Sequence, residues 1–112
     1  MTSRTLASTL ATTLAGLATG LEDVRVHITG GSMTWSRGPV AFAVLDGPAV
    51  ELRLDRAVAE AALKTPGTEA SERGPEWVRY APATIEGHDL DRLTAWFALA
   101  HRRAAPPARA PR

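Results

Sequence analysis

The sequence predicts an α+β fold, an antiparallel β-meander with helices packed on one face. Apolar residues recur with helical spacing near both ends of the chain, over residues 4–19 and 88–103. Between them, four segments alternate apolar and polar side chains, and tight turns join them as only antiparallel neighbours allow. The predicted order is helix, four strands, helix, strand and helix (α-β-β-β-β-α-β-α).

Residues 4–19 are predicted to form an amphipathic helix because leucines recur at spacings of four and three residues. The leucines of this stripe are Leu6, Leu10, Leu14, Leu17 and Leu21. Gly20 is expected to end the helix as a left-handed cap. The opposite stripe is Thr, Ser and Ala without strong charge, so we expect part of it to be covered.

The first two strands are predicted to form a hairpin with Gly30-Gly31 as its two-residue loop. This loop pairs apolar with apolar residues on one face and polar with polar residues on the other. The predicted pairs are Ile28 with Met33, Val26 with Trp35, His27 with Thr34 and Arg25 with Ser36.

Residues 40–45 and 49–54 are predicted to form the next hairpin through Asp46-Gly47-Pro48. A three-residue loop places Phe42 opposite Leu52, whereas a two-residue Asp-Gly loop would place it opposite Glu51. Because a slip of one residue moves every side chain to the other face, we predict the three-residue loop. The outer face, away from the helices, then shows Ala41, Ala43, Glu51 and Arg53.

The second half of the chain is predicted to hold a short helix, a loop, a strand and a long helix. Asp55 is the expected N-cap of a helix of about ten residues. A charged surface loop is predicted for residues 65–76 and a strand for residues 77–81. In the last helix, residues 88–103, acidic residues begin the helix and arginines end it, which suits the helix dipole.

Length and composition predict one domain over residues 1–103, followed by a disordered Arg/Pro/Ala tail over residues 104–112. The chain has 112 residues and no cysteine, which excludes disulfides, thiolate nucleophiles and zinc sites built on sulfur. No signal peptide or membrane-spanning stretch is recognisable. We therefore expect a soluble cytoplasmic protein that does not contact a membrane.

The net charge of +1 conceals an asymmetry along the chain. Four arginines lie after residue 101, namely Arg102, Arg103, Arg109 and Arg112. Of the 13 basic residues, this leaves nine against 12 acidic ones in residues 1–101. A mildly acidic body is a poor partner for phosphate backbones, so nucleic-acid binding is disfavoured.

No motif for catalysis, metal binding or a cofactor emerges. No serine lies in a strand-turn-helix elbow, and Gly30-Gly31 lies between two strands rather than before a helix. His88 and His101 lie about 20 Å apart along one helix, without partners at ligand spacing. We expect no enzyme; an acid-base pair of His27 and Glu51, on different strands, is the weaker alternative.

The outer face of the sheet is the candidate site, since polar side chains gather there over small alanines. Its plain interpretation is a solvated surface with cross-strand ion pairs. Its functional interpretation is a binding site for a carboxylate or another anion held by arginines. Trp77 and Arg79 share one face of their strand and add an aromatic platform. The candidate ligand-binding residues are Arg25, His27, Arg53, Trp77 and Arg79.

Four segments resemble the small bacterial proteins known as luciferase-domain, or luciferase-family, proteins. These segments are residues 50–54, 59–66, 73–80 and 90–97, and the likeness spans residues 20–103. The resemblance implies a compact α+β domain of unassigned activity and gives no evidence of light emission. The layout is also similar, more weakly, to YjbR-type double-wing domains, for which nucleic-acid binding has been suggested.

Together these features predict a non-enzymatic binding or interaction module that uses the outer face for a small anionic ligand or another protein chain. The alternative is nucleic-acid binding through the arginine tail and Arg79. A homodimer and a monomer both stay open, with the Thr/Ser/Ala stripe of the first helix and the alanine-floored face as candidate contact surfaces.

Overall fold

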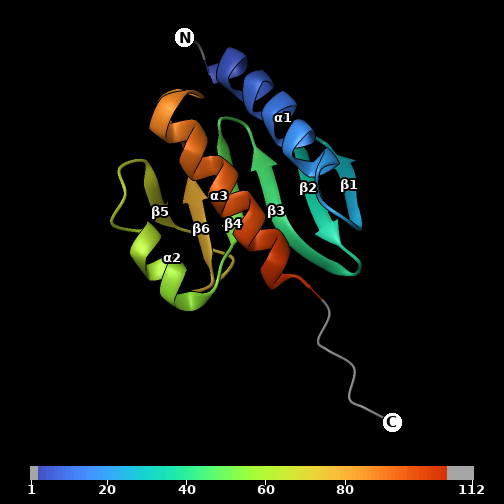
Figure 1. Ribbon diagram of the computed structural model, residues 1–112. Helices are drawn as coiled ribbons and strands as arrows, with labels where there is room; N and C mark the ends of the chain where they lie inside the picture. The colour runs from blue at the N-terminus through green and yellow to red at the C-terminus, as the bar shows by residue number, and fades with distance from the viewer. Residues whose placement is uncertain (1–2, 106–112) are drawn as a thin grey trace.

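Six antiparallel strands form one sheet, in the order β1-β2-β3-β4-β6-β5, in a computed structural model that describes residues 3–105. Two long helices, α1 and α3, cross one face of it, which we call the inner face, and α2 packs beside β6 (Figure 1). The elements are α1 (Ser3–Thr19), β1 (Val24–Thr29), β2 (Ser32–Arg37), β3 (Val40–Asp46), β4 (Ala49–Arg53), α2 (Arg56–Ala62), β5 (Thr68–Ala70), β6 (Trp77–Tyr80) and α3 (Gly87–Arg103). The α+β prediction is confirmed.

The core lies between the inner face and the two long helices. Phe97 of α3 is its centre, packing edge-on against Trp35 of β2 and Phe42 of β3. The leucine stripe of α1 contributes Leu10 and Leu14, both fully buried. Burial of these side chains supplies most of the driving force for folding and holds the sheet against the helices.

The first hairpin has the predicted register. Its pairs include Ile28 with Met33 and Val26 with Trp35. Gly30 has a φ of +57°, which a tight primed turn requires of its first loop residue.

The predicted register of the second hairpin is wrong. The loop is Gly47-Pro48, so Ala43 lies opposite Leu52 and Val44 opposite Glu51. Gly47 has a φ of +61° and Pro48 fixes the next φ near −65°, which together suit a type II′ turn.

A β-bulge accounts for the difference, because Phe42 has no opposite residue on β2. The extra residue turns Ala43 into the core, where it is fully buried, so its predicted place on the outer face is also wrong.

The predicted surface loop contains a strand, β5, which pairs with β6 and extends the sheet by one edge. Gly20 is not left-handed; α1 ends with amides that donate to carbonyls three residues back, and the positive φ occurs at Asp23.

The helix that begins after Asp55 has seven residues rather than about ten, and the Asp55 side chain makes no capping hydrogen bond. That carboxylate instead lies 3.8 Å from Nη1 of Arg103.

Ala104, the first residue of the predicted tail, is the C-cap of α3 and is buried in the core. The rest of that predicted tail, residues 106–112, lies outside the described residues. No helix within residues 3–105 has the length and apolar character needed to cross a membrane.

Candidate functional site

The outer face carries one continuous row of paired residues that crosses the whole sheet. From β1 to β5 the row consists of His27, Thr34, Val44, Glu51, Arg79 and Glu69. Its one apolar residue, Val44, is on β3, and its carboxylates and its arginine lie at the β4-β6-β5 end. The β4-β6-β5 end of the outer face therefore holds most of the charged side chains of the row.

The five ligand-binding candidates separate into two groups. Arg53 lies opposite Trp77, and Arg79 is on the same face of β6, as the alternation predicts. Arg25 and His27 are on β1, three strand spacings from β4, a separation of about 14 Å. The structure thus brings Arg53, Trp77 and Arg79 together and leaves the two β1 residues apart from them.

The same separation removes the weaker enzymatic alternative. His27 and Glu51 stand at opposite ends of three strand spacings, far beyond the roughly 3 Å that direct proton transfer requires. They do not form an acid-base pair.

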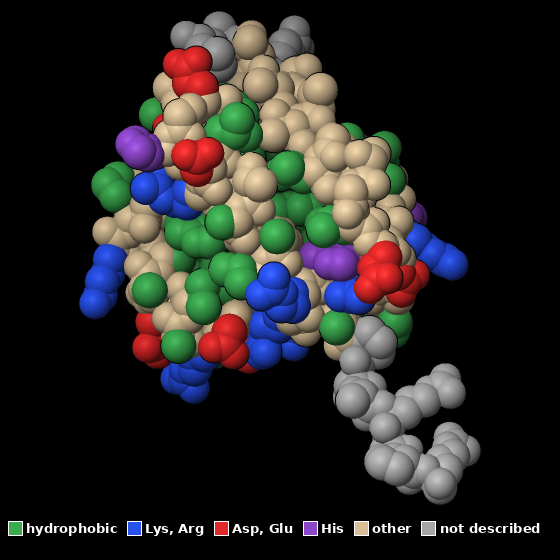
Figure 2. Space-filling view, in the orientation of Figure 1, with side chains coloured by type: hydrophobic (Ala, Val, Ile, Leu, Met, Phe, Trp, Pro, Cys, Tyr) green, Lys and Arg blue, Asp and Glu red, His purple; other side chains and the backbone are tan. Residues whose placement is uncertain are grey.

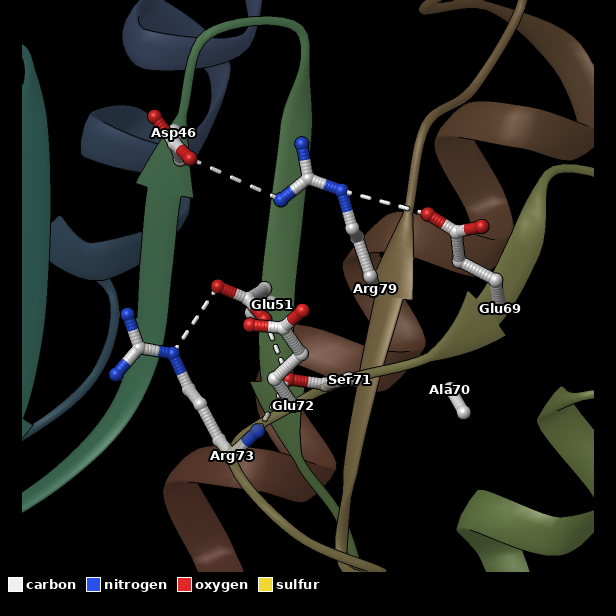
Figure 3. Close-up of a pocket in the computed structure, with 8 residues that line it drawn as sticks. All are labelled: Asp46, Glu51, Glu69, Ala70, Ser71, Glu72, Arg73 and Arg79. Atoms are coloured by element: carbon white, nitrogen blue, oxygen red, sulfur yellow. Dashed lines mark hydrogen bonds and ion pairs between the residues drawn. The ribbon is translucent and has the colours of Figure 1, made fainter.

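A cavity of about 640 Å³ opens at the charged end of the outer face (Figure 3). β3, β4, β5 and β6 supply one wall, and the segment that follows β5 supplies the other. The residues that line it are Asp46, Glu51, Glu69, Ala70, Ser71, Glu72, Arg73 and Arg79.

Glu51 is the most buried of the acidic lining residues, with 8% of its surface exposed. Its neighbours Val50 and Leu52 fill the core, so the alternation of β4 directs Glu51 outward to the floor of the cavity. Its carboxylate accepts hydrogen bonds from the Ser71 hydroxyl and, at 3.0 Å, from Nε of Arg73. These bonds fasten the segment after β5 to the sheet.

Arg79 forms a second bridge across the cavity. Its Nη1 lies 3.8 Å from Oδ2 of Asp46 at the end of β3, and its Nε lies 3.6 Å from Oε1 of Glu69 on β5. The guanidinium stands between the two carboxylates in Figure 3. It is therefore already matched to carboxylates before any ligand arrives.

Glu72 is the one lining carboxylate for which the described structure gives no hydrogen bond or ion pair, and Figure 3 draws no contact to it. The lining holds four carboxylates and two guanidiniums. The surplus negative charge lies on Glu72 and on the Asp46-Arg79-Glu69 bridge, because Glu51 and Arg73 balance each other.

A smaller hollow of about 300 Å³ adjoins the cavity, and Arg73 lines both. The Arg73 guanidinium lies 5.5 Å from the centre of the Trp77 ring, a cation-π contact. Arg53 borders this hollow, with Nη2 at 3.5 Å from Glu76. Trp77 and Arg53 are thus neighbours of the cavity rather than part of its lining.

The shifted pKa values occur in a different cluster, where β6 meets the start of α3. The Tyr80 hydroxyl donates to Oδ1 of Asp89 at 3.1 Å, and Thr84 donates to Oδ2 at 2.8 Å. Burial raises the pKa of Tyr80, and the hydrogen bond from Thr84 lowers the pKa of Asp89. This cluster lies on the inner face and fastens α3 to the sheet.

Among residues 3–105, no group of three His, Cys, Asp or Glu side chains is arranged to hold a metal ion. Arg25 is exposed and has no carboxylate partner within the same range. The other outer-face candidates, Arg53 and Arg79, are both paired.

Sequence reasoning identified the strand that carries Arg79 but not the cavity around it. It missed Asp46, Glu69, Ser71, Glu72 and Arg73. Most of these residues belong to β5 or to the segment after it, and three residues are too few to show a strand pattern. The usable signal was the density of charge over residues 69–79 beside a strand with two outward polar positions.

Comparison with known proteins gives no relative: no family model matches the chain, and no significant match occurs among curated proteins or solved structures.

Proposed function

We propose that this protein is a non-enzymatic binding module whose outer-face cavity takes a small ligand with a positively charged amine or guanidinium group. The observation that carries the proposal is the charge of the lining, in which both arginines are already paired and Glu72 is not. Its volume, about 640 Å³, is typical of small-molecule pockets.

A cation enters this cavity at a lower cost than an anion. An anion that recruited Arg73 would separate it from Glu51, whose side chain is only 11% exposed and would lose its charged partner. An anion that recruited Arg79 would likewise free two carboxylates. A cation can pair with Glu72 and leave every existing contact intact, so the charge distribution favours it over the anion expected from sequence.

Phosphate-bearing partners are disfavoured for the same reason. Arg79, the expected nucleic-acid contact on the sheet, stands between Asp46 and Glu69. The surplus negative charge around it repels a polyanion. The proposal therefore does not include nucleic-acid binding.

The resemblance to luciferase-domain proteins is part of this proposal as a family hypothesis. Its four segments contribute β4, the end of α2, β6 and the middle of α3, and residues 73–80 border the cavity. A binding role agrees with a family that the resemblance describes as having no assigned activity.

The test is a thermal-shift comparison of two cations, agmatine and 1,4-diaminobutane, with two anions, glutarate and inorganic phosphate, at low ionic strength. A ligand at ten times its Kd stabilises the folded state by about 1.4 kcal/mol, which raises Tm by several degrees. We expect this shift from at least one cation and from neither anion.

The matched variants are Glu72→Gln in the cavity and Glu60→Gln on α2, which is exposed and outside it. Glu72→Gln should weaken cation binding at least about tenfold, and Glu60→Gln should leave it unchanged. Stabilisation by the anions alone, or equal binding by both variants, would overturn the proposal.

A further inference from the structure

The free edge strand β1 presents an apolar surface on the side opposite the cavity. Val26 is 51% exposed and Ile28 67% exposed, and they are two of the three exposed large hydrophobic residues within residues 3–105. Both are on the inner face, beyond the cover that α1 provides. Val26 also borders a hollow of about 240 Å³, whose lining residues are Ala15, Ala18, Thr19, Val24, Val26, Met33 and Trp35.

Within residues 3–105, no strand pairs with the outer edge of β1. The primed turn at Gly30-Gly31 makes Thr29 and Ser32 a hydrogen-bonded pair. In an antiparallel pair every second residue makes such bonds, so the backbone groups of every second residue of β1, counted back from Thr29, bond to β2. The N–H and C=O groups of Val24, Val26 and Ile28 therefore point to the open edge. These are also the three residues whose side chains are apolar.

β1 lacks most of the features that usually protect an edge strand. It has six residues, no proline and no bulge against β2, and its arginine, Arg25, lies on the outer face. The other edge, β5, shows the contrast: it has three residues and carries Glu69 at its centre. Only the β1 edge is long and regular enough to accept another strand.

We infer that a second copy of this chain pairs with β1, antiparallel, about a two-fold axis that passes through Val26 perpendicular to the sheet. This register places Val26 opposite Val26 and Val24 opposite Ile28 of the other copy, each as a hydrogen-bonded pair. Apolar side chains meet apolar side chains on the inner face. The sheets of the two copies become continuous, and both sets of helices stay on one side.

The absence of charged side chains on α1, beside the β1 edge, favours a second copy of this chain as the occupant. Residues 5–21 contain no charged side chain, and Figure 2 shows the exposed side of α1 without acidic or basic groups. A two-fold axis brings the same surface of the two copies together. Because this surface is uncharged, the copies do not repel each other there, and no charged group loses its hydration when they meet. Arg25 then lies opposite His27 of the other copy on the outer face, where solvent screens it.

This contact differs from the surfaces expected from sequence. The outer face does not have the predicted alanine floor, because Ala43 is buried in the core instead. The polar stripe of α1 is instead continuous with the β1 edge, since Ala15 and Thr19 line the hollow beside Val26.

The test is sedimentation equilibrium of the full chain over about a hundredfold range of concentration, with Ile28→Lys and Leu63→Lys as variants. Both replaced residues are exposed, at 67% and 43%, and only Ile28 lies on β1. We expect wild type and Leu63→Lys to approach twice 11.9 kDa, and Ile28→Lys to associate at least about tenfold more weakly.

Amide hydrogen exchange keeps the inference falsifiable if a variant folds poorly. In wild type the Val26 and Ile28 amides should become protected as the concentration rises, because they acquire partners only in the dimer. A mass of 11.9 kDa at every concentration, or a dimer that persists in Ile28→Lys with these amides unprotected, would overturn it.

Discussion

At the scale of the residue, Glu51 connects the core to the cavity. Its neighbours Val50 and Leu52 are fully buried, so the strand has no freedom to turn Glu51 away from the outer face. Its carboxylate then receives Ser71 and Arg73 from the segment after β5. A residue fixed by the hydrophobic pattern of β4 thus determines where a loop lies.

Glu51→Ala should reduce the free energy of unfolding by about 1–2 kcal/mol. Hydrogen bonds to a charged group contribute about 1.5–3 kcal/mol, and the half-exposed Arg73 lowers that value. Urea denaturation measures the loss, and amide exchange should accelerate over residues 71–73. Glu60→Ala, which removes an exposed i,i+4 ion pair, is the control and should cost less than about 0.5 kcal/mol. Equal losses in the two variants would mean that Glu51 does not fasten the segment.

The lowered pKa of Asp89 predicts that the folded state loses stability at acidic pH. The hydrogen bond from Thr84 is the main cause that lowers the pKa of Asp89 in the folded state. The ionised carboxylate therefore stabilises the folded state at pH values above the pKa of the unfolded chain, which is near 3.8. That contribution disappears as the pH falls through the folded pKa. The stability gap between wild type and Asp89→Asn should therefore be widest at neutral pH and shrink below about pH 4. Denaturation at a series of pH values checks this, and a gap that does not change with pH would contradict it.

At the scale of the element, prediction succeeded where local chemistry determines the structure. Gly30-Gly31 specifies a two-residue turn, and the alternation on both sides admits one register. The second hairpin failed because a bulge at Phe42 changes the alternation within β3, and nothing in the local pattern marks it. β5 was missed because it is a strand only through its pairing with β6. The cavity depends on both features, so it could not be derived from the sequence.

Gly67 allows β5 to approach β6 and should not tolerate a side chain. It has a φ of +86°, and a Cβ there would lie 2.9 Å from the carbonyl oxygen of Ala81. Gly67→Ala should therefore destabilise the protein by about 2 kcal/mol or more.

Gly16→Ala is the matched control, because a Cβ in the middle of α1 meets nothing within 4 Å. It should stabilise the protein by about 0.5–1 kcal/mol. Thermal unfolding of the two variants compares them directly, and a loss of stability in Gly16→Ala comparable to that in Gly67→Ala would contradict this explanation.

At the scale of the whole molecule, the strand order places the two proposed surfaces at opposite ends of the sheet. The cavity lies at the β4-β6-β5 end and the free edge of β1 at the other. A dimer through β1 would therefore leave both cavities open on the outer face. The ligand-binding residues predicted from the sequence lie at both ends of the sheet, so the strand order divides them into two separate groups.

This arrangement predicts that ligand binding and association are independent. Ile28→Lys should bind a cationic probe as wild type does, and Glu72→Gln should associate as wild type does, because the mutated sites share no contacts. Calorimetric titration and sedimentation of both variants measure the two properties. Loss of both properties in one well-folded variant would contradict the separation.

The most direct test of the central claim is a ¹⁵N-¹H correlation spectrum of the full chain titrated with agmatine at low ionic strength. We predict saturable shifts at the amides around the cavity, from Glu69 to Arg73 and at Arg79, with few on β1, and their loss in Glu72→Gln. Shifts confined to other surfaces, or no shifts while glutarate produces them, would contradict the claim that the cavity binds a cation.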